Sequence, residues 1–210
     1  MQTIIFLNGT PPGKNIIKKF LKEKCFIIAA DGGANYLKKV NVTPDLIIGD
    51  LDSINKHTLQ YFQKRKVKVS KIKEQDTNDF EKSLMYCKKN KFEDIIVFGA
   101  AGLRPDHTLN NYSVLKRYYK SFNIRLISGE FEILFIKKFI KFRYRVNEIV
   151  SLLALPKAAK IHTKGLKYRL SNESLSFGVR EGTLNKSISE DISISFESGS
   201  LLLFKKHFIK

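Results

Sequence analysis

Cysteine and long apolar runs are both scarce in this sequence of 210 residues. The two cysteines, Cys25 and Cys87, are too few for a disulfide framework, and neither belongs to a closely spaced pair of the metal-binding type. We expect both to be small core residues in a reducing compartment. The longest apolar runs, at 4–7, 25–30 and 200–204, are far too short to cross a bilayer, and the N-terminus lacks the basic-then-apolar pattern of a signal peptide. These features predict a cytoplasmic protein with no membrane partner.

Acidic residues are scarce too, and the chain is strongly basic, with 20 Asp and Glu against 38 Lys and Arg and a net charge of +18. Such a surface attracts polyanions, so nucleic-acid binding is one hypothesis. The basic residues, however, are scattered as lysine pairs along almost every segment, at 18–19, 38–39, 88–89, 137–138 and 205–206. Scattered pairs are typical of solvated faces, and we therefore expect no nucleic-acid partner.

Residues 1–128 alternate short apolar segments with helical patterns. Six segments are rich in Ile and Val and almost continuously apolar, as strands buried on both faces are: 3–7, 26–30, 46–48, 67–69, 95–98 and 124–127. Between them, apolar residues recur at helical steps over 80–87 and 109–119. This alternation predicts an α/β domain in which helices cover both faces of a parallel sheet.

Residues 129–210 follow a different pattern, with a period of two. Apolar residues alternate with polar ones over 142–146 and 192–196, which indicates half-buried antiparallel strands. Ser198-Gly199 then predicts a turn before the apolar run 201–204, as in a hairpin. We predict a small all-β domain over 129–210, a sandwich, closely joined to the α/β domain.

Segments with acidic residues lie after predicted strands of the first domain, directly after three of them and a few residues after the strand 67–69. Ligands of an open α/β sheet bind beyond the carboxyl ends of its strands. Those positions hold the segments 31–35 (DGGAN), 49–53 (GDLDS), 75–80 (QDTNDF) and 99–107 (GAAGLRPDH). Because acid is scarce in this chain, its concentration at one edge of the sheet is hard to attribute to solubility.

Two pairs of these acids are spaced to act together. Asp50 and Asp52 are two apart, so an extended backbone would point both side chains the same way. Asp76 and Asp79 are three apart and would share a face at a helix start. Clustered carboxylates stay ionised together only around a cation, and oxygen ligands without His or Cys select a hard ion such as Mg²⁺. A site for Mg²⁺ with a nucleotide is the economical interpretation.

Several of these residues also have a purely structural interpretation. Asp31, Asp76 and Asp106 are each placed to be a helix N-cap, a position that favours Asp. Gly32-Gly33 either lets backbone N–H groups approach a phosphate or simply turns the chain. The GxxxxGK[ST] and GxGxxG nucleotide fingerprints are absent.

The four acidic segments together resemble the ordered motif set of the thiamine pyrophosphokinase family. The C-terminal half adds 165–170 (GLKYRL), 171–173 (SNE) and 182–185 (GTLN), so the resemblance covers nearly the whole chain in the right order. It implies transfer of pyrophosphate from ATP to the hydroxyl of thiamine, which gives thiamine diphosphate and AMP. It also implies a homodimer, in which 1–128 binds ATP and Mg²⁺ while 129–210 binds thiamine and forms the dimer.

The resemblance assigns roles to individual residues. The implied catalytic residues are Asp31, Asp50, Asp52, Asp79, Arg104 and Asp106, of which Asp50, Asp52 and Asp79 would hold Mg²⁺. The implied substrate-binding residues are Gly32, Asn35, Gln75, Asp76, Thr77, Tyr168, Ser171, Asn172 and Asn185. Arg104 would clamp the triphosphate, and Gln75 would lie near the thiamine pyrimidine. Tyr168 stands where several relatives carry Trp, and its ring would keep an aromatic face toward thiamine.

Two other functions remain open from the sequence. Another Mg²⁺-dependent phosphotransferase or phosphohydrolase would use the same acidic edge with a different acceptor. A basic nucleic-acid-binding protein would need basic and aromatic residues gathered on one face. The sequence does not decide which aspartate accepts the proton of the attacking hydroxyl.

Overall fold

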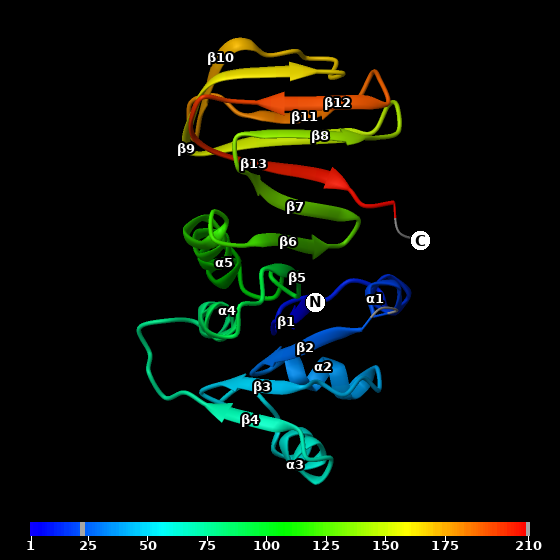
Figure 1. Cartoon of the computed structure of the whole chain (residues 1–210), viewed down its shortest axis with the longest axis vertical. Helices are drawn as coiled ribbons and strands as arrows, with labels where there is room; N and C mark the ends of the chain where they lie inside the picture. The colour runs from blue at the N-terminus through cyan, green and yellow to red at the C-terminus, as the bar shows by residue number, and fades with distance from the viewer. Residues whose placement is uncertain (22–23, 209–210) are drawn as a thin grey trace. The chain divides into compact units, whose positions relative to one another are not determined.

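The computed structural model describes residues 1–21 and 24–208, which fall into two compact units, Met1–Glu130 and Phe131–Phe208 (Figure 1). The predicted domain boundary, between 128 and 129, lies two residues before the division between these units. Among the described residues, no helix is long and apolar enough to span a membrane.

The N-terminal unit contains six parallel strands in the order β4-β3-β2-β1-β5-β6. Their bounds are β1 Gln2–Phe6, β2 Cys25–Ala30, β3 Leu46–Gly49, β4 Lys68–Lys71, β5 Asp94–Phe98 and β6 Asn123–Ser128. All six strands predicted from the sequence are confirmed, with ends shifted by at most two residues. The central strand β1 is almost wholly buried, as its run of Thr and Ile requires.

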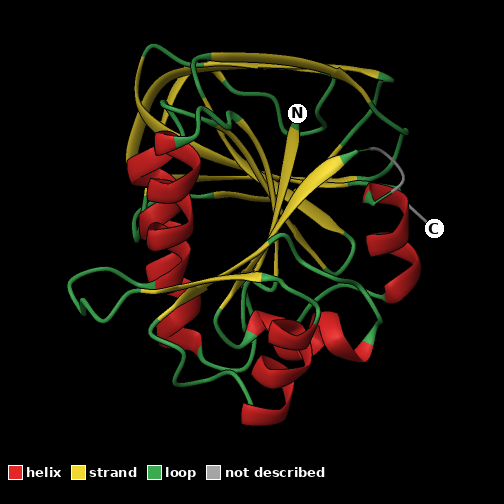
Figure 2. Cartoon of the chain, turned by 60° about the horizontal axis from the view of Figure 1, so that its bottom comes forward, coloured by secondary structure: helices red, strands yellow, loops and turns green. Residues whose placement is uncertain are grey.

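Five helices of the N-terminal unit are α1 Lys14–Phe20, α2 Gly33–Lys39, α3 Lys56–Lys64, α4 Asp79–Lys89 and α5 Pro105–Tyr118. Ile17, Leu37 and Phe62 of the first three helices pack in one buried cluster with Ile4 and Phe6 of β1. Alternate residues of a strand face opposite sides, so a second layer must cover the other face. There α4 packs against β2, β3 and α5, and Figure 2 shows the helices in red flanking the yellow strands.

The order of the strands reverses beside β1. The chain proceeds from β1 outward through β2, β3 and β4, and then returns to place β5 on the other side of β1. In open α/β sheets the crevice at such a reversal, outside the carboxyl ends of the strands, is where ligands bind. The fold thus points to the loops after β1, β2, β3 and β5.

The C-terminal unit consists of antiparallel strands around a buried apolar cluster that includes Val150, Ile161, Ile194 and Leu203. The strands are β7 Phe131–Ile136, β8 Phe139–Arg143, β9 Ile149–Lys164, β10 Ser171–Ser176, β11 Gly182–Lys186, β12 Asp191–Ser195 and β13 Ser198–Lys206. The long strand β9 pairs with β10, β11, β12 and β13 and so organises the unit.

Two local predictions for this unit are wrong. The turn at Ser198-Gly199 does not join a hairpin, because β12 and β13 both pair with β9 instead of with each other. The alternating pattern over 142–146 does not continue as a strand, because β8 ends at Arg143. Tyr144 is buried after the strand, where its hydroxyl donates to the carbonyl of Ile149 (2.9 Å) and accepts from the N–H of Lys206 (2.6 Å).

Candidate active site

A cavity of about 570 Å³ lies at the carboxyl ends of the strands of the N-terminal unit. Its walls come from the ends of β1, β2 and β5, the loop after β3, and the loops that precede α4 and α5. Of the residues expected at the site, those that line the cavity are Asp50, Asp52, Gln75, Asp76, Thr77, Asp79 and Arg104. The predicted convergence of distant loops on one cavity is therefore present in the fold.

Three carboxylates meet at this edge, and we refer to Asp31, Asp50 and Asp79 as the acidic cluster. They follow β2 and β3 and begin α4, respectively, and each offers an oxygen such that the three atoms lie within 4.8 Å of one another. Like charges this close repel strongly in the absence of a cation. Three oxygen donors from three separate elements are a donor set suited to a hard divalent ion.

Asp31 is the most deeply placed member of the acidic cluster, with 1% of its surface exposed. Its carboxylate accepts hydrogen bonds from the backbone N–H groups of Ser53 (2.8 Å) and Ile54 (3.2 Å), which tie the loop after β3 to the end of β2. Burial raises the pKa of Asp31 to about 6 despite these two bonds, and the neighbouring charge of Asp79 adds to the increase. A cation in the cluster would favour the ionised form.

Asp79 is the first residue of α4, and its carboxylate is not fully satisfied. Burial raises the pKa of Asp79, while the ammonium group of Lys82, 3.5 Å away, acts in the opposite direction. Its buried Oδ1 accepts no hydrogen bond of ordinary geometry from the described residues. Gly49, at φ 147°, leaves the space beside it open, because a Cβ at that position would lie 2.9 Å from Asp79 Oδ1 and from the Cβ of Asp31. A buried oxygen that meets the ammonium group of Lys82 only at 3.5 Å, beside space kept free by glycine, fits a bound metal ion.

Asp52 lies at the cavity but outside the acidic cluster. The extended backbone expected over 50–52 is not found, because Leu51 adopts a left-handed φ of 67°. The N–H of Asp52 donates to Asp50 Oδ1 (3.2 Å), and the hydroxyl of Ser53 donates to Asp52 Oδ1 (2.9 Å). The bond from Ser53, followed by interaction with Asp31, lowers the pKa of Asp52. Asp31 thus occupies the place in the three-oxygen group that the resemblance implied for Asp52.

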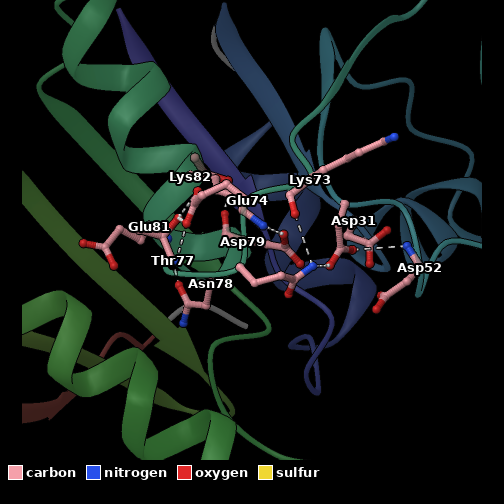
Figure 3. A network of polar contacts seen from close by, with 12 residues as sticks. Asp31, Asp52, Lys73, Glu74, Thr77, Asn78, Asp79, Glu81 and Lys82 are labelled. Carbon is pink, nitrogen blue, oxygen red and sulfur yellow. Dashed lines mark hydrogen bonds and ion pairs between the residues drawn. The ribbon is translucent and has the colours of Figure 1, made fainter.

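The loop before α4 brings more polar groups to the cavity. Gln75 Nε2 donates to Asp50 Oδ2 (3.3 Å), and Thr77 donates from both its N–H and its hydroxyl to Glu74. Asp76 lines the cavity but lies before the helix, so it does not share a helical face with Asp79 as predicted. Figure 3 shows Glu74 and Thr77 of this loop in one network of polar contacts with Asp31 and Asp79.

Arg104 and Asp106 form an exposed ion pair at 2.6 Å. Arg104 lines the cavity, and its guanidinium lowers the pKa of Asp106 to about 2. Asp106, one of the catalytic residues implied by the resemblance, is neither among the residues that line the cavity nor a member of the acidic cluster. In the structure its carboxylate instead partners the guanidinium expected to meet a triphosphate.

Gly32 and Asn35 lie beside the site and support it without lining the cavity. A Cβ at Gly32 would collide with the side chain of Asn8, so glycine permits the close approach of two loops. The amide of Asn35 donates to the carbonyl of Ser53 (3.0 Å) and accepts from the N–H of Asn55 (3.0 Å). These bonds fix the loop that carries Asp50.

The interpretation of three aspartates as helix caps is wrong. The N-cap residues of α2, α4 and α5 are Gly32, Asn78 and Arg104, so Asp31, Asp76 and Asp106 are each displaced from the capping position. Of these caps only Asn78 uses its side chain, which accepts from the N–H of Glu81 (2.9 Å).

The remaining predicted residues belong to the C-terminal unit. Asn185 is buried and holds both backbone groups of Tyr168, accepting from its N–H (2.9 Å) and donating to its carbonyl (2.7 Å). Tyr168 is 61% exposed. Ser171 begins β10, and Asn172 follows it at a left-handed φ of 60°. Tyr168 is therefore presented on the surface of this unit by a fixed backbone.

Lys82 and Asn111 are among the cavity-lining residues that the sequence interpretation missed. Lys82 is buried on the first turn of α4, three residues after Asp79. Asn111 of α5 donates to the carbonyl of Ala100 (2.8 Å) and accepts from Asn78 Nδ2 (3.1 Å), so it joins two loops of the site. The spacing of Lys82 from Asp79 on a predicted helix was the one signal available in the sequence, while the contact of Asn111 depends on how α4 and α5 pack.

Comparison with known families gives two matches, one in each half of the chain. The model described as thiamin pyrophosphokinase, catalytic domain, matches residues 17–127. The model described as thiamin pyrophosphokinase, vitamin B1 binding domain, matches residues 139–201. The first match contains all three residues of the acidic cluster, and the second contains Tyr168 and Asn185.

Curated relatives and solved structures agree with these matches. The chain is 28% identical to thiamin pyrophosphokinase 1 of Caenorhabditis elegans over 216 residues, covering 95% of this chain and 86% of the relative. It is 30% identical to thiamine pyrophosphokinase 2 of Arabidopsis thaliana over 205 residues, covering 84% and 76%. The crystal structure of thiamine pyrophosphokinase from Bacillus subtilis has the same fold, with a TM-score of 0.87 at 22% identity over 98% of this chain and 99% of that one.

Proposed function

The chain belongs to the thiamine pyrophosphokinase family, and from this membership we propose which of its groups carry out the transfer of pyrophosphate from ATP to thiamine. The products are thiamine diphosphate and AMP. Neither a different phosphotransferase nor a nucleic-acid-binding protein is favoured by the comparisons. The observation that carries the proposal is the convergence of Asp31, Asp50 and Asp79, from three separate elements, to within 4.8 Å.

The acidic cluster is our proposed site for Mg²⁺, with Asp31, Asp50 and Asp79 as the ligands. The fit rests on three carboxylate oxygens, the buried Oδ1 of Asp79 and the space left by Gly49. When bound, the ion would neutralise phosphate oxygens of ATP and so lower the cost of charge development. Asp52, linked by hydrogen bonds to the same loop, would orient Asp50 from outside the first set of ligands.

Arg104 is our proposed clamp for the triphosphate. It lines the cavity and is 65% exposed at its side chain, so a phosphate can reach it from solvent. The planar guanidinium suits two phosphate oxygens at once. Asp106 holds Arg104 in position before the nucleotide arrives, and phosphate would compete for the same donors. The hydroxyl of thiamine would then attack the β-phosphorus with AMP as the leaving group, and positioning of these groups supplies most of the rate.

The C-terminal residues supply our proposed thiamine-binding and dimerisation domain. We place thiamine against the exposed ring of Tyr168, whose backbone Asn185 fixes, with Ser171 and Asn172 nearby in sequence. Gln75 is our proposed contact for the pyrimidine of thiamine. The proposal retains a two-domain subunit, divided near 128/129 with a β-sandwich as the second domain, that works as a homodimer in the cytoplasm without nucleic acid.

The direct test supplies the purified protein with ATP, Mg²⁺ and thiamine and identifies the products by chromatography. We expect AMP and thiamine diphosphate in equal amounts, and neither product when Mg²⁺ is removed with EDTA. Omission of thiamine is the control for simple ATP hydrolysis. ADP together with thiamine monophosphate would contradict the proposed reaction, because it would show transfer of a single phosphoryl group.

A further inference from the structure

Lys82 is a buried lysine whose side chain is 2% exposed. Lysine is almost never buried to this extent unless its charge has a partner. Its partner is the carboxylate of Asp79, with 3.5 Å between Lys82 Nζ and Asp79 Oδ1, and the two residues occupy the same face of α4. Figure 3 shows Lys82 in one polar network with Asp79 and Asp31.

The position of Lys82 differs from that of the other basic groups around the cavity. Among the described residues that line it, the basic side chains are Lys82, Arg104 and His107. Arg104 is 65% exposed and already paired with Asp106, which does not line the cavity. Lys82 is thus the buried cation beside the acidic cluster. Burial raises the pKa of Asp79, and the charge of Lys82 opposes this increase. The hydrogen bond from Ser53 lowers the pKa of Asp52, and the charge of Lys82 adds to this decrease.

The negative charge of the acidic cluster explains why a buried lysine lies next to it. The three ionised carboxylates carry three negative charges, so one divalent ion leaves one charge unbalanced. The single ammonium group of Lys82 supplies the missing charge. In the absence of metal it also reduces the repulsion among these carboxylates and the neighbouring carboxylate of Asp52, which are partly removed from water, where unbalanced charge is costly.

We propose that Lys82 is the resident counter-ion of the acidic cluster, a positioning residue that holds the Asp79 carboxylate and balances the charge that a divalent ion leaves over. This inference rests on the metal site of the proposed function and extends it to a residue of this chain. The proposal predicts the direction in which the affinity for Mg²⁺ changes when Lys82 is removed. Removal of Lys82 should strengthen the binding of Mg²⁺ to the nucleotide-free protein, because a positive charge near the cation is lost, while it destabilises the metal-free protein.

The test compares Lys82→Met and Lys82→Arg with the wild type, without nucleotide. Calorimetric titration with MgCl₂ should give a Kd for Lys82→Met that is lower by ~3- to 10-fold, as expected when one unit charge is removed at short range near the surface of a cavity. Lys82→Arg keeps the charge and should retain the Kd of the wild type within twofold. Denaturant unfolding should show that Mg²⁺ raises the free energy of unfolding of Lys82→Met by more than it raises that of the wild type.

Two variants on the same helix are matched controls. Glu81 is also a buried charge on the first turn of α4, but it pairs with Arg117 and does not line the cavity. Glu81→Gln should therefore lower stability without changing the Mg²⁺ affinity. Lys88→Met removes the same charge near the end of α4, outside the cavity lining, and should change neither quantity.

The outcomes separate this inference from the proposed function. An unchanged or higher Kd for Mg²⁺ in Lys82→Met would overturn the proposed role of Lys82 as counter-ion, even if the wild type transfers pyrophosphate to thiamine. A lower Kd in Lys82→Met with an unchanged Kd in Glu81→Gln would support it, even if the wild type proved inactive toward thiamine, an outcome that would overturn the thiamine function alone.

Discussion

Asp31 shows how burial gives one residue its role in this site. The carboxylate lies at the end of a buried strand, is 1% exposed and receives two backbone N–H groups from the loop after β3. These two hydrogen bonds offset only part of the effect of burial, since burial still raises the pKa of Asp31 to about 6. A side chain that is costly to ionise in the empty site becomes a good ligand once a cation is present.

The raised pKa of Asp31 predicts the pH dependence of stability in the metal-free protein. The ordinary value is 3.8 and the folded value about 6, so between these values the folded state binds more protons than the unfolded state. The free energy of unfolding in EDTA should therefore fall as pH rises from about 4 to 6, by up to ~3 kcal/mol from this group. Urea unfolding at a series of pH values measures the slope.

Asp31→Asn is the matched variant for this measurement, because it cannot ionise. Its unfolding free energy should change less with pH over the same interval, and Mg²⁺ should stabilise it less than the wild type at pH 7. Identical pH profiles for the two proteins would show that Asp31 ionises as easily in the folded state as in the unfolded one.

At the scale of elements, the sequence was most informative where burial is complete. The buried strands of the α/β unit were predicted because two covered faces require continuous apolar runs. The pattern was less reliable at surfaces, since Leu109 fits the apolar spacing of α5 but is 69% exposed. The pairing of β12 and β13 with β9 was missed because period two reports which residues face inward and carries no information about the neighbouring strand.

The site was predicted to a similar degree, for similar reasons. The rule that ligands bind beyond strand ends led to the segments that contain Asp31, Asp50 and Asp79, whereas the metal set implied by the resemblance was Asp50, Asp52 and Asp79. The exchange of Asp52 for Asp31 in the cluster depends on the left-handed φ of Leu51, which nothing in the sequence marks. Lys82 was missed because lysines are so frequent here that a single buried one does not stand out.

Asn78 connects the start of α4 to the site and gives a test at this scale. Its side chain caps α4 through the N–H of Glu81 and donates to Asn111 (3.1 Å). Asn78→Ala should lower the free energy of unfolding by about 1–2 kcal/mol, as loss of a side-chain cap does. Because α4 begins with Asp79, the same change should also weaken Mg²⁺ binding.

Asn55 provides the control for this variant. It is the N-cap of α3, but its side chain makes no capping hydrogen bond. Asn55→Ala should therefore lower the free energy of unfolding by much less than Asn78→Ala does, and denaturant unfolding curves of both variants measure the difference. Equal losses for the two would show that the cap of Asn78 contributes no specific stability.

At the scale of the whole molecule, the central claim is that distant parts of the chain build one metal site. The reversal of strand order beside β1 brings the ends of β1 and β5 to the same cavity as the loops after β2 and β3. The acids are 19 and 29 positions apart along the chain, between 31 and 50 and between 50 and 79, and only the parallel sheet makes them neighbours. The chain carries an excess of 18 positive charges, and a net positive charge attracts an anionic nucleotide.

The measurement that tests this claim most directly is a crystal structure of the protein with Mn²⁺, located by its anomalous scattering. Mn²⁺ takes the same oxygen ligands as Mg²⁺ and is far easier to identify in a diffraction experiment. The account predicts one strong peak within about 2.3 Å of carboxylate oxygens of Asp31, Asp50 and Asp79, in the range of oxygen–metal bonds. A peak held by other residues, with these three carboxylates free of metal, would contradict it.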